Sequence, residues 1–187
     1  MSNAFATLGL GAGAQRAIAA RDYVEPTAVQ REAIPAVLAG RDVWACAQTG
    51  SGKTAAFALP IIQRCALLPA GAALQALVLV PTRELAQQVA AVCEDFAREA
   101  TRALKVVSAF GGVSINPQMM ALRGGADIVV ATPGRLLDLI EHNALRLDEV
   151  HTLVLDEADR LFDLGFAEEL ARVLTGLPVR RQNLLFS

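Results

Sequence analysis

Lysine is scarce in this chain. Of its 17 basic residues only two are lysines, Lys53 and Lys105, and 19 acidic residues bring the net charge to −2. A strongly basic surface over the whole molecule is therefore not expected, which argues against nucleic-acid binding by bulk charge alone. The net charge does not exclude a basic site on one part of the surface.

Long hydrophobic runs are also missing. Although 53% of the 187 residues are hydrophobic, no run approaches the roughly 18 residues that a membrane helix needs, and Pro60 and Pro81 interrupt the longest ones. The first residues carry neither the basic nor the apolar segment of a secretory signal. The composition instead predicts one domain with a large core and no membrane partner.

Cysteine is infrequent and irregularly spaced. The three cysteines, Cys46, Cys65 and Cys93, do not have the spacing of a metal site. We expect reduced thiols packed as small apolar groups, as in a cytoplasmic protein.

Short runs rich in Val and Ile alternate with longer helical stretches. This pattern predicts an α/β fold whose mostly parallel central sheet has helices on both faces. Strands are predicted at 43–46, 76–80, 105–110, 127–131, 152–155 and 183–186. Helices are predicted at 13–20, 27–39, 53–67, 83–99, 114–122, 134–141 and 166–174, with a loop at Pro69–Ala73.

A glycine-rich segment near the start resembles a dinucleotide-binding fingerprint. Residues 9–14 read GLGAGA, but only residues 5–8 precede them as a possible strand. The fingerprint requires a strand before it and a βαβ unit around it. We therefore interpret residues 9–14 as a loop that enters a helix.

A second glycine-rich segment follows a predicted strand and opens a predicted helix. Residues 47–54 read AQTGSGKT, which matches the phosphate-binding loop except that Ala47 replaces the first glycine. Such a loop curls so that its N–H groups point at phosphate oxygens, and the helix start adds its positive end. Lys53 is predicted to reach the terminal phosphates, and the hydroxyl of Thr54 to bind Mg²⁺.

An acidic cluster follows the apolar strand predicted at 152–155. Asp156 and Glu157 lie at its carboxyl end, where open α/β sheets bind ligands. Asp156 is a candidate Mg²⁺ ligand, and Glu157 can orient and deprotonate the water that attacks the γ-phosphate. Together with Lys53, these two residues form the predicted catalytic set.

These motifs resemble those of a known family. Residues 156–159 spell DEAD and residues 47–54 read AQTGSGKT, so the chain resembles the first RecA-like domain of a DEAD-box ATP-dependent RNA helicase, nearest to the RhlE-like bacterial group. The resemblance covers residues 1–187 as a single RecA-like P-loop domain, with a Q-motif region at 3–31 and a core at 34–187. It implies ATP and Mg²⁺ as cofactors and a monomeric chain.

The resemblance extends to the adenine site. Residues 23–30 look like the family's Q motif, which implies that Gln30 reads the adenine edge, Tyr23 stacks on the ring and Phe5 supports the segment. A carboxamide suits adenine because it offers a donor beside an acceptor. The implied nucleotide-binding residues are Phe5, Tyr23, Thr27, Gln30, Ala47, Gln48, Thr49, Gly50, Ser51, Gly52, Lys53, Thr54 and Asp159.

Three further segments, each following a predicted strand, match the family's RNA-contacting motifs. They offer hydroxyls, free backbone N–H groups or a guanidinium, which hold phosphates without reading bases. The implied RNA-binding residues are Pro81, Thr82, Arg83, Gly111, Gly112, Thr132, Pro133, Gly134 and Arg135. RNA with little sequence specificity is the implied partner.

The last residue, Ser187, directly follows the strand predicted at 183–186 and looks like the first residue of the family's Ser-Ala-Thr motif. By analogy that strand lies between the phosphate-loop strand and the DEAD strand. A second RecA-like domain, which supplies arginines to the γ-phosphate in this family, is expected outside this chain, so the chain alone should bind adenine nucleotide without unwinding RNA. A P-loop kinase, a non-catalytic RNA clamp and a DNA helicase remain alternatives.

Overall fold

The structure is a computed structural model that describes residues 4–69 and 73–187. Within them, six strands form one sheet in the order β1-β6-β5-β2-β4-β3, and every neighbouring pair is parallel. All six predicted strands are confirmed to within one residue at either end. The strands are β1 (Val43–Ala45), β2 (Ala76–Leu79), β3 (Val106–Ala109), β4 (Ile128–Ala131), β5 (Thr152–Asp156) and β6 (Gln182–Phe186).

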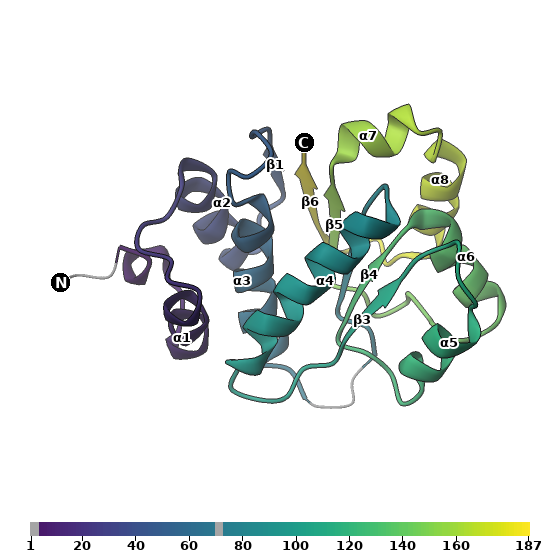
Figure 1. The fold of residues 1–187 in the computed structure, drawn as a ribbon, viewed down its shortest axis with the longest axis horizontal. Helices are drawn as coiled ribbons and strands as arrows, with labels where there is room; N and C mark the ends of the chain where they lie inside the picture. Colours follow the sequence, from purple (N-terminus) through teal and green to yellow (C-terminus); the bar gives the residue numbers. More distant parts are fainter. Residues whose placement is uncertain (1–3, 70–72) are drawn as a thin grey trace.

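The predicted helices are present as well, each within two residues of its predicted bounds (Figure 1). They are α1 (Ala12–Ala20), α2 (Ala28–Leu38), α3 (Lys53–Cys65), α4 (Arg83–Arg98), α5 (Asn116–Leu122), α6 (Pro133–Glu141) and α8 (Ala167–Gly176). Of the predicted loop at Pro69–Ala73, residues 70–72 lie outside the described residues.

Two short elements were not predicted. The 3-10 turn η1 (Ala6–Leu8) precedes α1, and α7 (Ala158–Asp163) follows β5 directly. No loop separates β5 from α7, because the single residue Glu157 makes the turn with a left-handed backbone (φ 51°). Asp159, which the family resemblance assigns to the nucleotide site, lies in this unpredicted helix.

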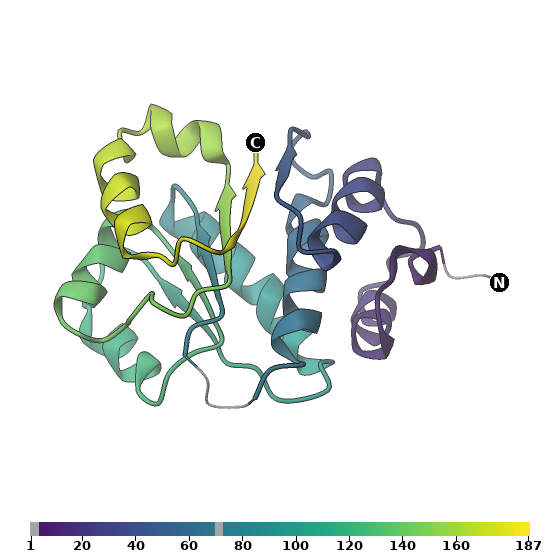
Figure 2. The same cartoon turned by 180° about the vertical axis from the view of Figure 1, so that it is seen from behind.

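The sheet is covered by helices on both faces, as the alternation of residues along β2 shows. Val78 packs into the cluster under α3 and α4, whereas Leu77 and Leu79 pack into the cluster under α6 and α8. Helices α3 and α4 cross the near face in Figure 1, and α8 lies in front when the molecule is turned in Figure 2. The central strands are buried on both sides, which explains their continuous hydrophobic sequence.

The early glycine-rich segment serves helix packing. Gly11 caps α1, so residues 9–14 enter a helix as predicted. A Cβ on Gly13 would lie only 2.8 Å from the carbonyl oxygen of Glu99. Gly13 therefore lets α1 approach the end of α4, which accounts for a glycine there without any nucleotide.

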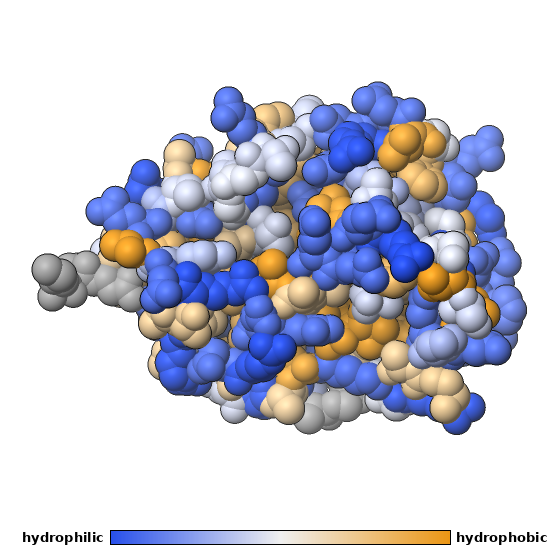
Figure 3. Space-filling view, in the orientation of Figure 1, coloured by the Kyte–Doolittle hydropathy of each residue, from blue (hydrophilic) through white to orange (hydrophobic). Residues whose placement is uncertain are grey.

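Two side chains near the phosphate-binding loop are exposed. Cys65 and Cys93 are buried as predicted, but Cys46, which was predicted to be packed with them, is exposed. Trp44 is 80% exposed on the edge strand β1. The face in Figure 3 mixes hydrophilic and hydrophobic residues. No helix in the described ranges is long and apolar enough to span a bilayer.

Candidate nucleotide and RNA site

The phosphate-binding loop connects β1 to α3. Gly50 and Gly52 have positive φ angles of 83° and 89°, which only glycine adopts easily, and Gly52 caps α3. The loop is tied to β6 by hydrogen bonds from the Ala47 N–H to the Ser187 carbonyl and from the Ser187 N–H to the Ala45 carbonyl. The loop is thus held at the carboxyl edge of the sheet, as predicted.

The loop has polar groups without protein partners. Within the described residues, the amides of Gly50 and Gly52 have no recorded partner, and the hydroxyl of Ser51 is buried and unpartnered. The ammonium of Lys53 donates to the Ala47 carbonyl at 2.6 Å, across the mouth of the loop. Donors arranged around a curved backbone loop fit a phosphate group.

Asp156 lies in line with the loop across the sheet. The parallel registers pair Ala45 with Phe186 and Phe186 with Asp156, so two strand spacings, roughly 10 Å, separate Ala45 from Asp156. Asp156 is 3% exposed, and its Oδ1 accepts the Glu157 N–H. Burial raises the pKa of Asp156 to about 6, although Lys53 opposes that rise.

A buried carboxylate without a paired cation fits a magnesium site. Asp156 forms no ion pair with a described residue. Mg²⁺ typically takes one or two protein oxygens and fills its other positions with phosphate oxygens and waters. Asp156 ends β5 and Thr54 lies in the first turn of α3, after β1, and β6 is the strand between β1 and β5. Their carboxylate and hydroxyl oxygens are ligands of the kind that Mg²⁺ takes, so the residues present fit the ion.

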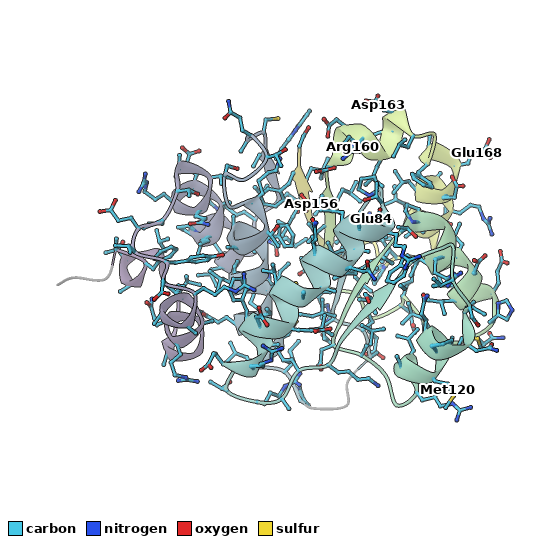
Figure 4. All side chains as sticks on the ribbon, viewed as in Figure 1. Glu84, Met120, Asp156, Arg160, Asp163 and Glu168 are labelled. Carbon is cyan, nitrogen blue, oxygen red and sulfur yellow. The ribbon has the colours of Figure 1, made fainter. Side chains whose placement is uncertain are left out.

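The other acidic residues of this edge are engaged by neighbours. Glu157 accepts from Arg160 at 2.6 Å, a partner that the sequence did not indicate. Asp159 is exposed, and a hydrogen bond from the Ser187 side chain is the main cause that lowers its pKa. Figure 4 shows Asp156 and Arg160 at the upper end of the domain, with Met120 at the opposite end.

The predicted adenine-binding residues contact the loop and one another. Gln30 is 4% exposed; its Oε1 accepts the Thr27 N–H at 3.0 Å and its Nε2 donates to the Gly52 carbonyl at 3.1 Å. Tyr23 stacks on Phe5, which is fully buried in the core. Phe5 therefore supports Tyr23 from the inside, while Gln30 keeps one further donor and one further acceptor position.

The three predicted RNA-contacting segments lie side by side. They follow β2, β3 and β4, which are neighbours in the sheet, so residues 81–83, 111–112 and 132–135 meet at one edge. Gly111, Gly112 and Arg83 are exposed. Figure 1 shows the starts of α4 and α6 at this upper edge of the sheet.

Two side chains in this region are buried and hydrogen-bonded to the backbone, which the sequence motifs did not predict. The side chain of Arg135 is only 8% exposed, and its Nη2 donates to the Val113 carbonyl at 2.8 Å. Gln118, which the sequence did not single out, bonds both backbone groups of Phe110. A buried amide on a short helix gives no recognisable motif, so only the structure identifies it.

Fold and site together define a P-loop nucleotide-binding domain of the RecA-like class. The family model described as DEAD/DEAH box helicase matches residues 27–187. The chain therefore belongs to the DEAD/DEAH box helicase family.

Curated relatives match essentially the whole chain. The RNA helicase CrhR of Synechocystis is 46% identical over 187 residues, all of this chain and 37% of CrhR. The ATP-dependent RNA helicase DeaD of Escherichia coli K12 is 48% identical over 98% of this chain and 29% of DeaD. CshA of Streptococcus pneumoniae, a DEAD-box ATP-dependent RNA helicase, is 46% identical over 98% of this chain. The chain thus spans about a third of the length of these relatives, and the RhlE-like grouping stays a prediction.

Proposed function

We propose that this chain is the ATP-binding domain of an ATP-dependent RNA helicase. The proposal rests on the register of β1, β6 and β5, in which Ala45 pairs with Phe186 and Phe186 pairs with Asp156. This register brings a phosphate-binding loop and a buried carboxylate to the same edge of the sheet. The relatives from Synechocystis and E. coli, which are 46% and 48% identical to this chain, are named RNA helicases. Their names support the proposed function.

In this proposal each residue of the site has a separate task. Lys53 leaves the Ala47 carbonyl and binds the β- and γ-phosphates, while the loop amides hold the phosphate chain. Thr54 and Asp156 would hold Mg²⁺, which would supply positive charge next to the phosphates. Glu157 releases Arg160 and accepts a proton from the attacking water.

Adenine selectivity is assigned to the Q-motif region. Gln30 offers its remaining donor and acceptor to the base, Tyr23 stacks against it, and Thr27 fixes the start of α2. Asp159, at the phosphate side, links the nucleotide site to Ser187.

The RNA surface is formed by the three segments at the ends of β2, β3 and β4. Its exposed contacts are Arg83 and the amides of Gly111 and Gly112, whereas Thr82 and Gly134 are half-buried and Thr132 and Pro133 are buried at the start of α6. Contacts of this kind hold the RNA backbone without reading bases, so an acidic domain can bind RNA locally.

We further propose that a second RecA-like domain is needed for catalysis. The relatives are about three times as long as this chain, and the family resemblance assigns γ-phosphate arginines to the second domain. The 187-residue chain should therefore bind adenine nucleotide, hydrolyse ATP slowly and unwind nothing.

The test is nucleotide binding followed by hydrolysis. A fluorescent ADP analogue with Mg²⁺ should bind this chain and be displaced by ATP better than by GTP. A longer protein with a second domain should show ATP turnover stimulated by RNA more than by DNA. Equal displacement by GTP, or unwinding of a short RNA duplex by the 187-residue chain alone, would contradict the proposal.

A further inference from the structure

The loop after β3 is exposed and makes few backbone hydrogen bonds. Residues 111–114 are exposed and do not enter a helix until Asn116, whereas the segments after β2 and β4 pass directly into α4 and α6. No backbone N–H of Gly111, Gly112 or Val113 donates a hydrogen bond to a described residue. Other side chains must therefore fix this loop.

Gln118 fixes the first end of the loop. Its Oε1 accepts the Phe110 N–H and its Nε2 donates to the Phe110 carbonyl, both at 3.1 Å and both buried. Phe110 lies just beyond β3, which is an edge strand. The side-chain amide thus supplies the donor and acceptor that a neighbouring strand would supply, in surroundings where hydrogen bonds are strong.

Phe110 in turn supports a predicted RNA contact. The guanidinium carbon of Arg83 lies 5.1 Å from the centre of the Phe110 ring. An arginine over an aromatic face is attracted to it and loses fewer conformations when it binds a phosphate. The place of Phe110 therefore affects both the glycine loop and Arg83.

Arg135 fixes the second end of the loop. Its Nη2 donates to the Val113 carbonyl at 2.8 Å, and its Nε contacts Asp138 at 3.4 Å. The side chain is 8% exposed, and Nη1 is buried without a hydrogen-bond partner among the described residues. A guanidinium held beneath the loop is poorly placed to bind a phosphate in solvent.

We propose that Gln118 and Arg135 are positioning residues that hold residues 110–113 in the geometry that binds RNA. Gln118 holds the backbone of Phe110 in place, and Arg135 holds the backbone of Val113. The two exposed glycines between them can therefore present their amides to a phosphate. The proposal rests on the proposed function, since it concerns the same RNA surface. It assigns Arg135 an indirect role in place of a direct phosphate contact.

Salt dependence separates positioning from direct contact. Each phosphate contact to a single strand contributes about 0.7 to the slope of log affinity against log salt. We expect Gln118→Met and Arg135→Met to weaken binding of a labelled oligouridine about three- to tenfold, with an unchanged slope. Arg83→Met should reduce the slope by about 0.7, because it removes a phosphate contact.

The measurement is fluorescence anisotropy over a range of salt concentrations, with matched controls. Arg146→Met removes an 82% exposed guanidinium from the turn before β5 and should leave RNA affinity unchanged. Binding of the fluorescent ADP analogue reports that Gln118→Met and Arg135→Met are folded. Should Gln118→Met not fold, Arg135→Met and Arg135→Lys, which keeps a donor for the Val113 carbonyl, carry the test.

The outcomes are distinct. Weakened binding at unchanged slope, with loss of the RNA-induced shifts of the Gly111 and Gly112 amides in NMR spectra, supports the positioning roles. A reduced slope for Arg135→Met, or wild-type affinity for both variants, overturns them. Absence of RNA binding by the wild-type protein would instead overturn the proposed function.

Discussion

The nucleotide site and the candidate RNA surface share one edge of the sheet but are built differently. At the ends of β1, β6 and β5 several polar side chains are engaged by protein groups, as Lys53 is with Ala47, Glu157 with Arg160, and Gln30 with Gly52. At the ends of β2 and β3 the contact groups Arg83, Gly111 and Gly112 are exposed, and the buried side chains of Gln118 and Arg135 hold the loop after β3.

This difference indicates how each region binds its ligand. In the candidate nucleotide site, a phosphate would have to replace the contact between Lys53 and Ala47, so we expect binding to be coupled to rearrangement of side chains. On the candidate RNA surface, Arg83, Gly111 and Gly112 are already exposed, and the position of the two glycines depends on Gln118 and Arg135. We therefore expect nucleotide binding to require more side-chain movement than RNA binding.

The largest effect should come from Lys53→Ala. Loss of a charge-assisted phosphate contact should weaken MgADP binding about 10- to 100-fold, while oligouridine binding stays at the wild-type level. Arg83→Met should give the reverse pattern. Titrations with both ligands check this, and a variant that weakened both equally would show that the two regions are not independent.

Two glycines of the loop test how tightly it is packed. A Cβ on Gly52 would lie 2.3 Å from Gln30 Nε2, whereas a Cβ on Gly50 meets nothing within 4 Å, and both have positive φ. We expect Gly50→Ala to lower the free energy of unfolding by about 1 kcal/mol through backbone strain. Gly52→Ala should cost about 2–3 kcal/mol, because it also displaces the buried amide.

Urea unfolding of both variants measures the difference. A similar loss of stability in the two variants would mean that the contact between Gln30 and Gly52 contributes little to the free energy of unfolding. Backbone strain alone would then account for the loss. The two variants should also differ in their affinity for MgADP, and Gly52→Ala should bind it more weakly than Gly50→Ala.

Asp156→Asn should stabilise the protein at neutral pH without ligand. Burial raises the pKa of Asp156 to about 6, so the folded state binds a proton that the unfolded state releases, and stability falls as pH rises from about 4 to 6. The variant should gain about 1–2 kcal/mol above pH 6, and the gain should vanish as pH falls toward 4.

Melting temperatures across this pH range provide the check, with Asp163→Asn in exposed α7 as the control. A gain that did not depend on pH would contradict the assignment to the Asp156 carboxyl. Binding of MgADP should be weaker in Asp156→Asn, because a magnesium ligand is lost.

The smallest effect concerns the thiols. Burial raises the pKa of both Cys65 and Cys93 to about 12, and Cys46 is exposed. A thiol reagent at mildly alkaline pH should therefore modify Cys46 alone in the folded protein. Mass spectrometry after labelling measures this, and rapid modification of Cys93 would indicate that α4 opens readily.

Much of the candidate nucleotide site could be predicted from the sequence because its motifs are local. Residues 47–54 span the loop after β1 and the start of α3, and residues 156–159 span the end of β5 and the start of α7. Strand bounds were predicted to within one residue, because buried parallel strands have continuous apolar sequences between helical stretches. The helix α7 was missed because a single residue, Glu157, turns the chain into it.

The sequence by itself determined the α/β alternation, the phosphate loop and the acidic pair, since each depends on neighbours within a few residues. Only the tertiary structure decided that Arg135 is buried, that Trp44 and Cys46 are exposed, and that Gln118 supports Phe110. Burial depends on which elements pack against a residue, and that follows from the strand order β1-β6-β5-β2-β4-β3, which no short segment encodes.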